Sequence, residues 1–104
     1  MVGLAIDLGT KIEVIDTLIK YVDLVLIMSV KAGKGGQEFD KTAIKKIKYV
    51  RTLSPQILIE VDGGINNNTA PLCVRAGADI LVAGTYVYNN DTYDAIQTLK
   101  GKNG

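Results

Sequence analysis

The chain has 104 residues, of which 47% are hydrophobic, so it is long and apolar enough for one packed globular domain. Twelve basic and eleven acidic residues leave a formal charge of +1, without the long block of like charges that favours nucleic acid. The sequence has no histidine and one cysteine, Cys73, which excludes an internal disulfide and a sulfur-rich zinc site.

The apolar segments are short. None approaches the roughly 20 residues that cross a bilayer, because Asp, Lys or Gly interrupts each run. The opening MVGLAIDLG lacks the basic and long apolar regions of a secretory signal. Together with the single cysteine, these features predict a cytosolic protein.

Strand-like and helix-like segments alternate along the chain. Apolar runs predict strands at 2–7, 23–30, 57–61 and 79–83, and apolar residues at helical spacing predict helices at 12–22, 44–53, about 68–76 and about 91–100. This alternation predicts parallel strands joined by right-handed crossovers, which is α/β architecture. We therefore expect residues 1–104 to form a single domain of four βα units.

The predicted strands are almost entirely apolar, which is typical of a sheet covered on both faces. Four helices of this size cover one face well. Something outside the chain must cover the other face, and we expect a dimer or larger assembly because monomers rarely expose so much apolar surface.

Glycines follow the predicted strands, at Gly9, at Gly33, Gly35 and Gly36, at Gly63 and Gly64, and at Gly84. The carboxyl ends of parallel strands bind ligands, and glycine lets a phosphate approach backbone N–H groups. The pattern indicates a phosphate cradle, in which Lys34 is a candidate anion contact. The alternatives are that these turns need glycine only for positive φ, and that Lys34 is simply solvated.

Asp62 ends the third predicted strand, directly before the two glycines. We expect its carboxylate to point into the concave side of the sheet, although an acid here could also cap a turn. Met28, late in its strand, either lines a pocket or fills the core. Tyr86 and Tyr88, beyond the last predicted strand, have the same two interpretations.

Three further aspartates are weaker candidates. Asp7 occupies the place after the first strand that Asp62 occupies after the third, but an acid there more often forms a local turn. Asp23 and Asp79 lie at strand entrances, on the opposite edge of the sheet, and we assign them to structure.

Four segments of this sequence resemble one known family. LVLIMSVKAGKGGQEF, IEVDGGI and ILVAGTYVY, in this order and spacing, resemble the last three βα units of ribulose-phosphate 3-epimerase, and GLAIDLGTKIEVI resembles the unit before them. The resemblance covers essentially the whole chain but only the second half of the family's barrel. It implies a (βα)4 half of a TIM (β/α)8 barrel of the ribulose-phosphate-binding type.

The resemblance also implies an activity. The family consists of isomerases of the pentose phosphate pathway that interconvert D-ribulose 5-phosphate and D-xylulose 5-phosphate at C3. Two aspartates exchange protons through an enediolate, which a divalent metal cation (Zn, Fe, Mn or Co) stabilises. Asp62 matches the second aspartate, which is also a metal ligand. The substrate-phosphate positions of the family match Gly33, Lys34, Gly35, Gly36, Gly63, Gly64, Gly84 and Thr85.

The sequence departs from the family in two respects. The other catalytic aspartate, two metal-binding histidines and a substrate-binding serine come from the barrel half that this chain does not match. Within the matched half, Asp7 and Leu8 replace an asparagine-proline pair, and Ala32 and Lys34 replace a proline and a phenylalanine of the glycine loop.

Three hypotheses follow. The first is an epimerase completed by a second copy in a homodimer or by a complementary half-barrel chain. The second is a half-barrel that binds sugar phosphate or phosphate without catalysis, and the third is a vestigial half-barrel that acts only by association. The family's substrate is a five-carbon sugar phosphate, and a six-carbon relative such as allulose 6-phosphate is an alternative.

Overall fold

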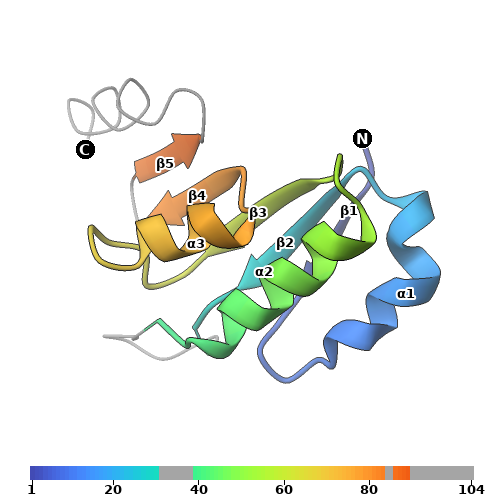
Figure 1. The fold of residues 1–104 in the computed structure, drawn as a ribbon, viewed down its shortest axis with the longest axis horizontal. Coiled ribbons are helices and arrows are strands. Elements are labelled where there is room, and N and C mark those ends of the chain that lie inside the picture. The colour runs from blue at the N-terminus through green and yellow to red at the C-terminus, as the bar shows by residue number, and fades with distance from the viewer. Residues whose placement is uncertain (31–38, 84–85, 90–104) are drawn as a thin grey trace.

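The computed structural model describes residues 1–30, 39–83 and 86–89, in which strands and helices alternate (Figure 1). The strands are β1 (Gly3–Ile6), β2 (Leu24–Met28), β3 (Leu58–Asp62), β4 (Ile80–Ala83) and β5 (Tyr86–Asn89). The helices are α1 (Ile15–Leu18), α2 (Thr42–Leu53) and α3 (Ala70–Ala76), with the 3-10 turns η1 (Ile12–Val14) and η2 (Ile19–Tyr21) on either side of α1.

The strands form one sheet in the order β1-β2-β3-β4-β5, and the first four run parallel. All four predicted strands are present, within two residues of their expected bounds. In Figure 1, α2 and α3 lie in front of the sheet and α1 lies beside β1. The predicted (βα)4 half of a TIM barrel is therefore confirmed over the described strands.

The fifth strand was not predicted. β5 turns back beside β4 and pairs with it antiparallel, with Val82 opposite Val87. The segment alternates tyrosine and valine, residues that favour strands, so it suits a further strand of the sheet. The helix predicted at about 91–100 and the side chains of Tyr86 and Tyr88 lie outside the described residues.

The helix predicted at 12–22 is broken into three short pieces. Only Ile15–Leu18 is α-helical, between the turns η1 and η2. Ile12, Val14, Ile15, Thr17 and Ile19 are all β-branched, which lowers helix propensity because χ1 is restricted against the preceding turn. The apolar spacing still brings Ile15 into the core, where it is fully buried.

A local feature of the sequence marks one end of each of the other two helices, the start of α2 and the end of α3. The Asp40 carboxylate accepts hydrogen bonds from Thr42 N at 2.8 Å and Thr42 Oγ1 at 2.7 Å, which stabilises the first turn of α2. Gly77, with φ of +123°, ends α3 directly after the predicted helix at about 68–76. Within the described ranges, no helix is long and apolar enough to cross a bilayer.

The core lies between the helices and one face of the sheet. Side chains alternate along each strand, so Val25, Ile27, Ile59 and Val61 are fully buried against the helices. Helices α2 and α3 contribute Ala43, Ile47, Val50, Ala70, Cys73 and Ala76. Leu53 and Leu72, two apolar residues of the same helices, are 42% and 39% exposed.

The opposite face of the sheet, here called the inner face, has no covering element among the described residues. It carries Leu24, Leu26, Met28, Leu58, Glu60, Asp62, Ile80 and Val82, as the register and the pleat require. None of these side chains is classed as buried, and Leu58 is 36% exposed. The apolar face predicted from the sequence is therefore uncovered as far as the described residues extend.

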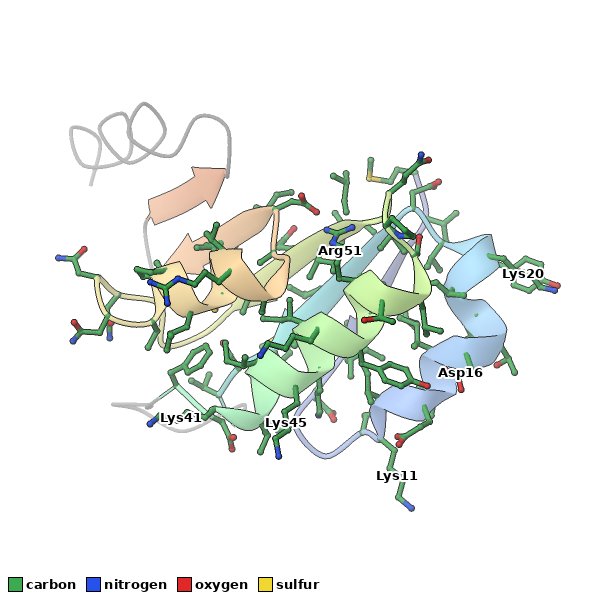
Figure 2. The ribbon with its side chains drawn as sticks, viewed as in Figure 1. Lys11, Asp16, Lys20, Lys41, Lys45 and Arg51 are labelled. Carbon is green, nitrogen blue, oxygen red and sulfur yellow. The ribbon has the colours of Figure 1, made fainter. Side chains whose placement is uncertain are left out.

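At the amino-terminal edge of the sheet, one arginine ties α2 to the loops before β3 and β4 (Figure 2). Arg51 Nη2 donates to Gly77 O at 2.7 Å and to Asp79 Oδ2 at 2.6 Å, and that carboxylate also accepts from Ile59 N at 2.9 Å. Arg51 Nη1 donates to three carbonyls after α2, the shortest bond being to Ile57 O at 2.8 Å. Asp79 is thus structural, as predicted.

Asp23 is also structural, because its Oδ2 accepts a hydrogen bond from Val2 N at 2.8 Å. This bond joins the segment before β2 to the segment before β1. The two aspartates at the strand entrances therefore stabilise this edge of the sheet, as the sequence predicted.

We expect Arg51→Met to lower the free energy of unfolding by about 2–3 kcal/mol, because the Asp79 carboxylate and several carbonyls lose their donor. Urea unfolding followed by circular dichroism measures the loss. Arg75→Met is the matched control, since Arg75 is exposed on α3 and has no hydrogen bond or ion pair among the described residues. Equal losses in the two variants would contradict the structural role of Arg51.

Candidate functional site

Asp62 is the last residue of β3 and lies at the carboxyl-terminal edge of the parallel strands. In register it stands between Met28 of β2 and Val82 of β4. The pleat places its side chain on the inner face, where it is partly exposed. A carboxylate here can reach a ligand that lies over the open face, at the edge where parallel α/β sheets bind ligands.

Ser29 holds the backbone that follows Asp62. Its side chain is fully buried, and its Oγ donates to Asp62 O at 3.0 Å and lies within hydrogen-bond distance of Gly63 O. Ser29 N also donates to Asp62 O at 2.9 Å, while Ser29 O accepts from Asp40 N at 2.7 Å. One residue thus joins the ends of β2 and β3 to the segment that begins α2.

The two glycines after Asp62 have backbone angles that other residues rarely adopt. Gly63 has φ of +120° and Gly64 has φ of +67°. A Cβ on Gly63 would lie 2.5 Å from Val30 Cγ2, and one on Gly64 would lie 2.6 Å from Phe39 N. Thr69 Oγ1 fixes the turn further by donating to Gly64 O at 2.9 Å. The turn therefore requires both glycines, whether or not a phosphate binds there.

Asp7 serves a local turn at the end of β1. Its Oδ1 accepts a hydrogen bond from Thr10 Oγ1 at 2.7 Å, and this bond holds the pKa of the exposed carboxyl below its usual value. Lys46 Nζ reaches the same turn from α2 and donates to three carbonyls, Asp7 O at 3.0 Å, Leu8 O at 3.1 Å and Thr10 O at 3.1 Å. This cation fixes the shape of the first βα loop.

A cavity of about 480 Å³ opens beside the ends of β1 and β2. Its described lining consists of Asp7, Leu8, Gly9, Met28, Val30, Asp40 and Thr42. Met28 thus lines a cavity, whereas Asp62 is not among the lining residues. The cavity and the Asp62 carboxylate lie next to each other at the same edge of the sheet and do not form one enclosed pocket.

Glu60 is a second carboxylate on the inner face, two residues before Asp62. Desolvation raises its pKa above the ordinary value, and the nearby charge of Asp62 raises it further. Glu60, Ser29 and Lys46 are not among the site residues predicted from the sequence. A signal existed for Glu60, because residues two apart on a strand share a face.

The remaining predicted phosphate contacts are Gly33, Lys34, Gly35, Gly36, Gly84 and Thr85, which lie outside the described residues. Of the predicted set, the structure describes Met28, Asp62, Gly63 and Gly64 at one edge of the sheet.

The side chains of this chain do not fit the divalent cation implied by the resemblance. Proteins bind catalytic divalent metals such as zinc with several His, Asp, Glu or Cys ligands, and the sequence contains no histidine. Among the described residues, no three His, Cys, Asp or Glu side chains are grouped to hold a metal ion. Asp62 offers one carboxylate, so a metal here would need further ligands from beyond the described residues.

The comparisons with known proteins agree with one another. The Ribulose-phosphate 3 epimerase family matches residues 1–88. Ribulose-phosphate 3-epimerase of Bacillus subtilis (strain 168) is 42% identical over 105 residues, covering 95% of this chain and 48% of that protein. The enzyme of the same name from Chlamydia pneumoniae is 42% identical over 110 residues, covering 97% and 48%.

A third relative, ribulose-phosphate 3-epimerase of Candida glabrata, is 38% identical over 97 residues, covering 92% of this chain and 39% of that protein. The chain therefore spans about half the length of the curated relatives it matches. The parallel (βα)4 sheet, the Asp62-Gly63-Gly64 turn at its carboxyl-terminal edge and these matches show that the chain belongs to the ribulose-phosphate 3-epimerase family.

Proposed function

We propose that this chain carries the Asp62 half of a ribulose-phosphate 3-epimerase active site, and that it is active when a partner supplies the other half. The observation that carries the proposal is the position of Asp62, at the carboxyl end of a parallel strand on an uncovered inner face. The family match includes this position. A homologous carboxylate on a rigid strand suits proton transfer to a bound sugar phosphate.

The chemistry explains why one half is insufficient. Asp62 as a carboxylate removes the proton from C3 of the substrate and leaves an enediolate, with the proton now on Asp62. Inversion requires that a second acid return a proton to C3 from the opposite face, because Asp62 alone would return it to the face it came from. The second acid therefore comes from the partner in this proposal.

The partner is either a second copy or a complementary half-barrel chain. In a closed eight-stranded barrel, both β1 and β4 would pair with strands of the partner. The outer edge of β4 is taken by β5 in this structure, whereas β1 pairs only with β2 among the described strands. Closure would require β5 to leave β4, and the first contact with a partner strand would form at β1.

The proposed phosphate contacts are the backbone N–H groups of Gly63 and Gly64, together with the predicted glycines outside the described residues. Lys41 and Lys45 project from the beginning of α2 (Figure 2), and their charge would favour an anion at this edge. We propose D-ribulose 5-phosphate as the substrate because the relatives are named for ribulose phosphate. The cytosolic location predicted from the sequence remains part of this proposal.

We expect the pure chain to show very weak or no conversion of D-ribulose 5-phosphate to D-xylulose 5-phosphate in a coupled spectrophotometric assay. Mixing it with the amino-terminal half of the Bacillus subtilis relative should raise the rate. In the mixture, Asp62→Asn should reduce kcat by at least about 100-fold, because the amide cannot accept the C3 proton.

Asp16→Asn is the matched control, since Asp16 is exposed on α1, away from the inner face (Figure 2). Full activity of the mixture with Asp62→Asn would remove Asp62 from the chemistry. Steady conversion by the pure chain that Asp62→Asn abolishes would remove the need for a different partner half.

A second candidate is a sugar-phosphate-binding half-barrel without catalysis, which the poor fit of the donor set to a metal favours. In this case we expect calorimetry to detect binding of ribulose 5-phosphate by the pure chain at millimolar concentration. The unphosphorylated sugar should bind at least about tenfold more weakly, since the backbone amides recognise the phosphate. The absence of binding by both ligands at millimolar concentration would exclude this candidate.

A further inference from the structure

Two carboxylates interrupt the inner face of the sheet. Its other side chains on β2, β3 and β4 are apolar, namely Leu24, Leu26, Met28, Leu58, Ile80 and Val82. Asp62 lies at the carboxyl-terminal edge, where the site opens. Glu60 lies farther from that edge, within the apolar part of the face.

Glu60 is surrounded by groups that cannot neutralise it. In register it stands between Leu26 of β2 and Ile80 of β4, and Leu58 and Asp62 are its neighbours on the same face of β3. Asp62, the one titratable group among these neighbours, is itself an acid. Among the described residues, Glu60 has no hydrogen bond or ion pair. Within the described part of the chain, water on the open side is therefore what solvates its carboxylate.

Covering this face with a purely apolar surface would remove that water. A carboxylate that loses its solvent without gaining a donor is strongly destabilising, whereas a paired carboxylate is tolerated. A surface that covers the inner face and keeps Glu60 charged must therefore bring a hydrogen-bond donor, and best a cation, to the position opposite it, since Glu60 would otherwise take up a proton at a cost in free energy.

A second copy of this chain does not meet that requirement. If two copies pair about a twofold axis that coincides with the barrel axis, each side chain and its copy lie at the same position along that axis. In an eight-stranded barrel, alternate strands fill one interior layer, so β3 and its symmetry mate would bring Glu60 and its copy into the same layer. Two carboxylates would then face one interior without a cation between them.

We propose that the inner face binds a different polypeptide, one with an apolar face and a lysine or arginine opposite Glu60, and that Glu60 disfavours pairing with a second copy. This inference rests on the association assumed in the proposed function and not on catalysis. The partner is defined by its basic residue, because the described inner face carries two acids and no basic side chain.

The chain itself provides a probe for such a partner. In Glu60→Lys, the same apolar face carries a cation in place of the carboxylate. We expect an equimolar mixture of wild type and Glu60→Lys to form a pair at least about tenfold tighter than wild type alone, as measured by sedimentation velocity and native mass spectrometry. Glu60→Gln, which keeps the shape without the charge, should self-associate more tightly than wild type.

Two controls separate this effect from charge in general and identify the face. Glu13→Lys makes the same charge change at an exposed position on η1, and its mixture with wild type should show no tightening. Leu58→Asp, on the inner face at 36% exposure, should weaken the mixed pair, whereas Leu72→Asp, on α3 at 39% exposure, should not. Circular dichroism establishes that each variant is folded.

Three results would overturn the inference. These are a wild-type pair as tight as that of Glu60→Gln, equal behaviour of Glu60→Lys and Glu13→Lys, and monomers in every sample. The readout is association alone, so a chain without turnover or sugar-phosphate binding can still support it. Conversely, an active mixture with the Bacillus subtilis half would stand if the Glu60 variants showed no effect.

Discussion

The pleat of the sheet is the constraint on which the site depends. Val25, Ile27, Ile59 and Val61 are fully buried against the helices, so the residues between them must face the other way. A shift of β3 by one residue would turn Asp62 toward the helices and expose Ile59. Burying the apolar core on one side therefore fixes which side chains face a ligand or a partner on the other.

Hydrogen bonds from side chains to backbone carbonyls hold this arrangement at both edges of the sheet. At the carboxyl-terminal edge, Ser29 reaches the Asp62 carbonyl at the end of β3 and the Gly63 carbonyl after it, and Lys46 donates to carbonyls that follow β1. At the amino-terminal edge, Arg51 donates to carbonyls before β3 and β4 and to Asp79. These side chains satisfy loop carbonyls that neither helix nor sheet pairs, so the loops keep defined shapes without a closed barrel.

The sequence predicted the elements that follow from local patterns. Four apolar runs and the helical spacing of apolar residues located all four parallel strands and the helices α2 and α3, and Asp23 and Asp79 have structural bonds at the strand entrances, as expected. The sequence pattern did not predict the features that depend on tertiary contacts. β5 exists because the edge of β4 was available, and Leu53 is exposed because it lies at the end of α2, past the buried turn of Val50.

The site was only partly visible in the sequence. Asp62 stood out because a strand, an acid and two glycines follow one another, and the required positive φ of Gly63 and Gly64 agrees with that pattern. Ser29 and Lys46 could not be found in this way, since their partners lie more than 30 residues away. Glu60 did not stand out because most other residues of its strand are apolar. Its spacing of two residues from Asp62 nevertheless implied that the two side chains share a face.

The two carboxylates of β3 link assembly to chemistry. In the proposed function, Asp62 lies at the carboxyl-terminal edge, where a sugar phosphate would have access, and its carboxylate would accept the C3 proton. Glu60 sits within the apolar face, where any surface that closes over the site also removes its water. A partner that completes the site must therefore supply both the opposite acid and a donor for Glu60. In these two proposals, a second copy would add another Asp62 but also another Glu60 that no described residue pairs, so β3, which would supply one of the two acids, favours an unlike partner as the source of the other.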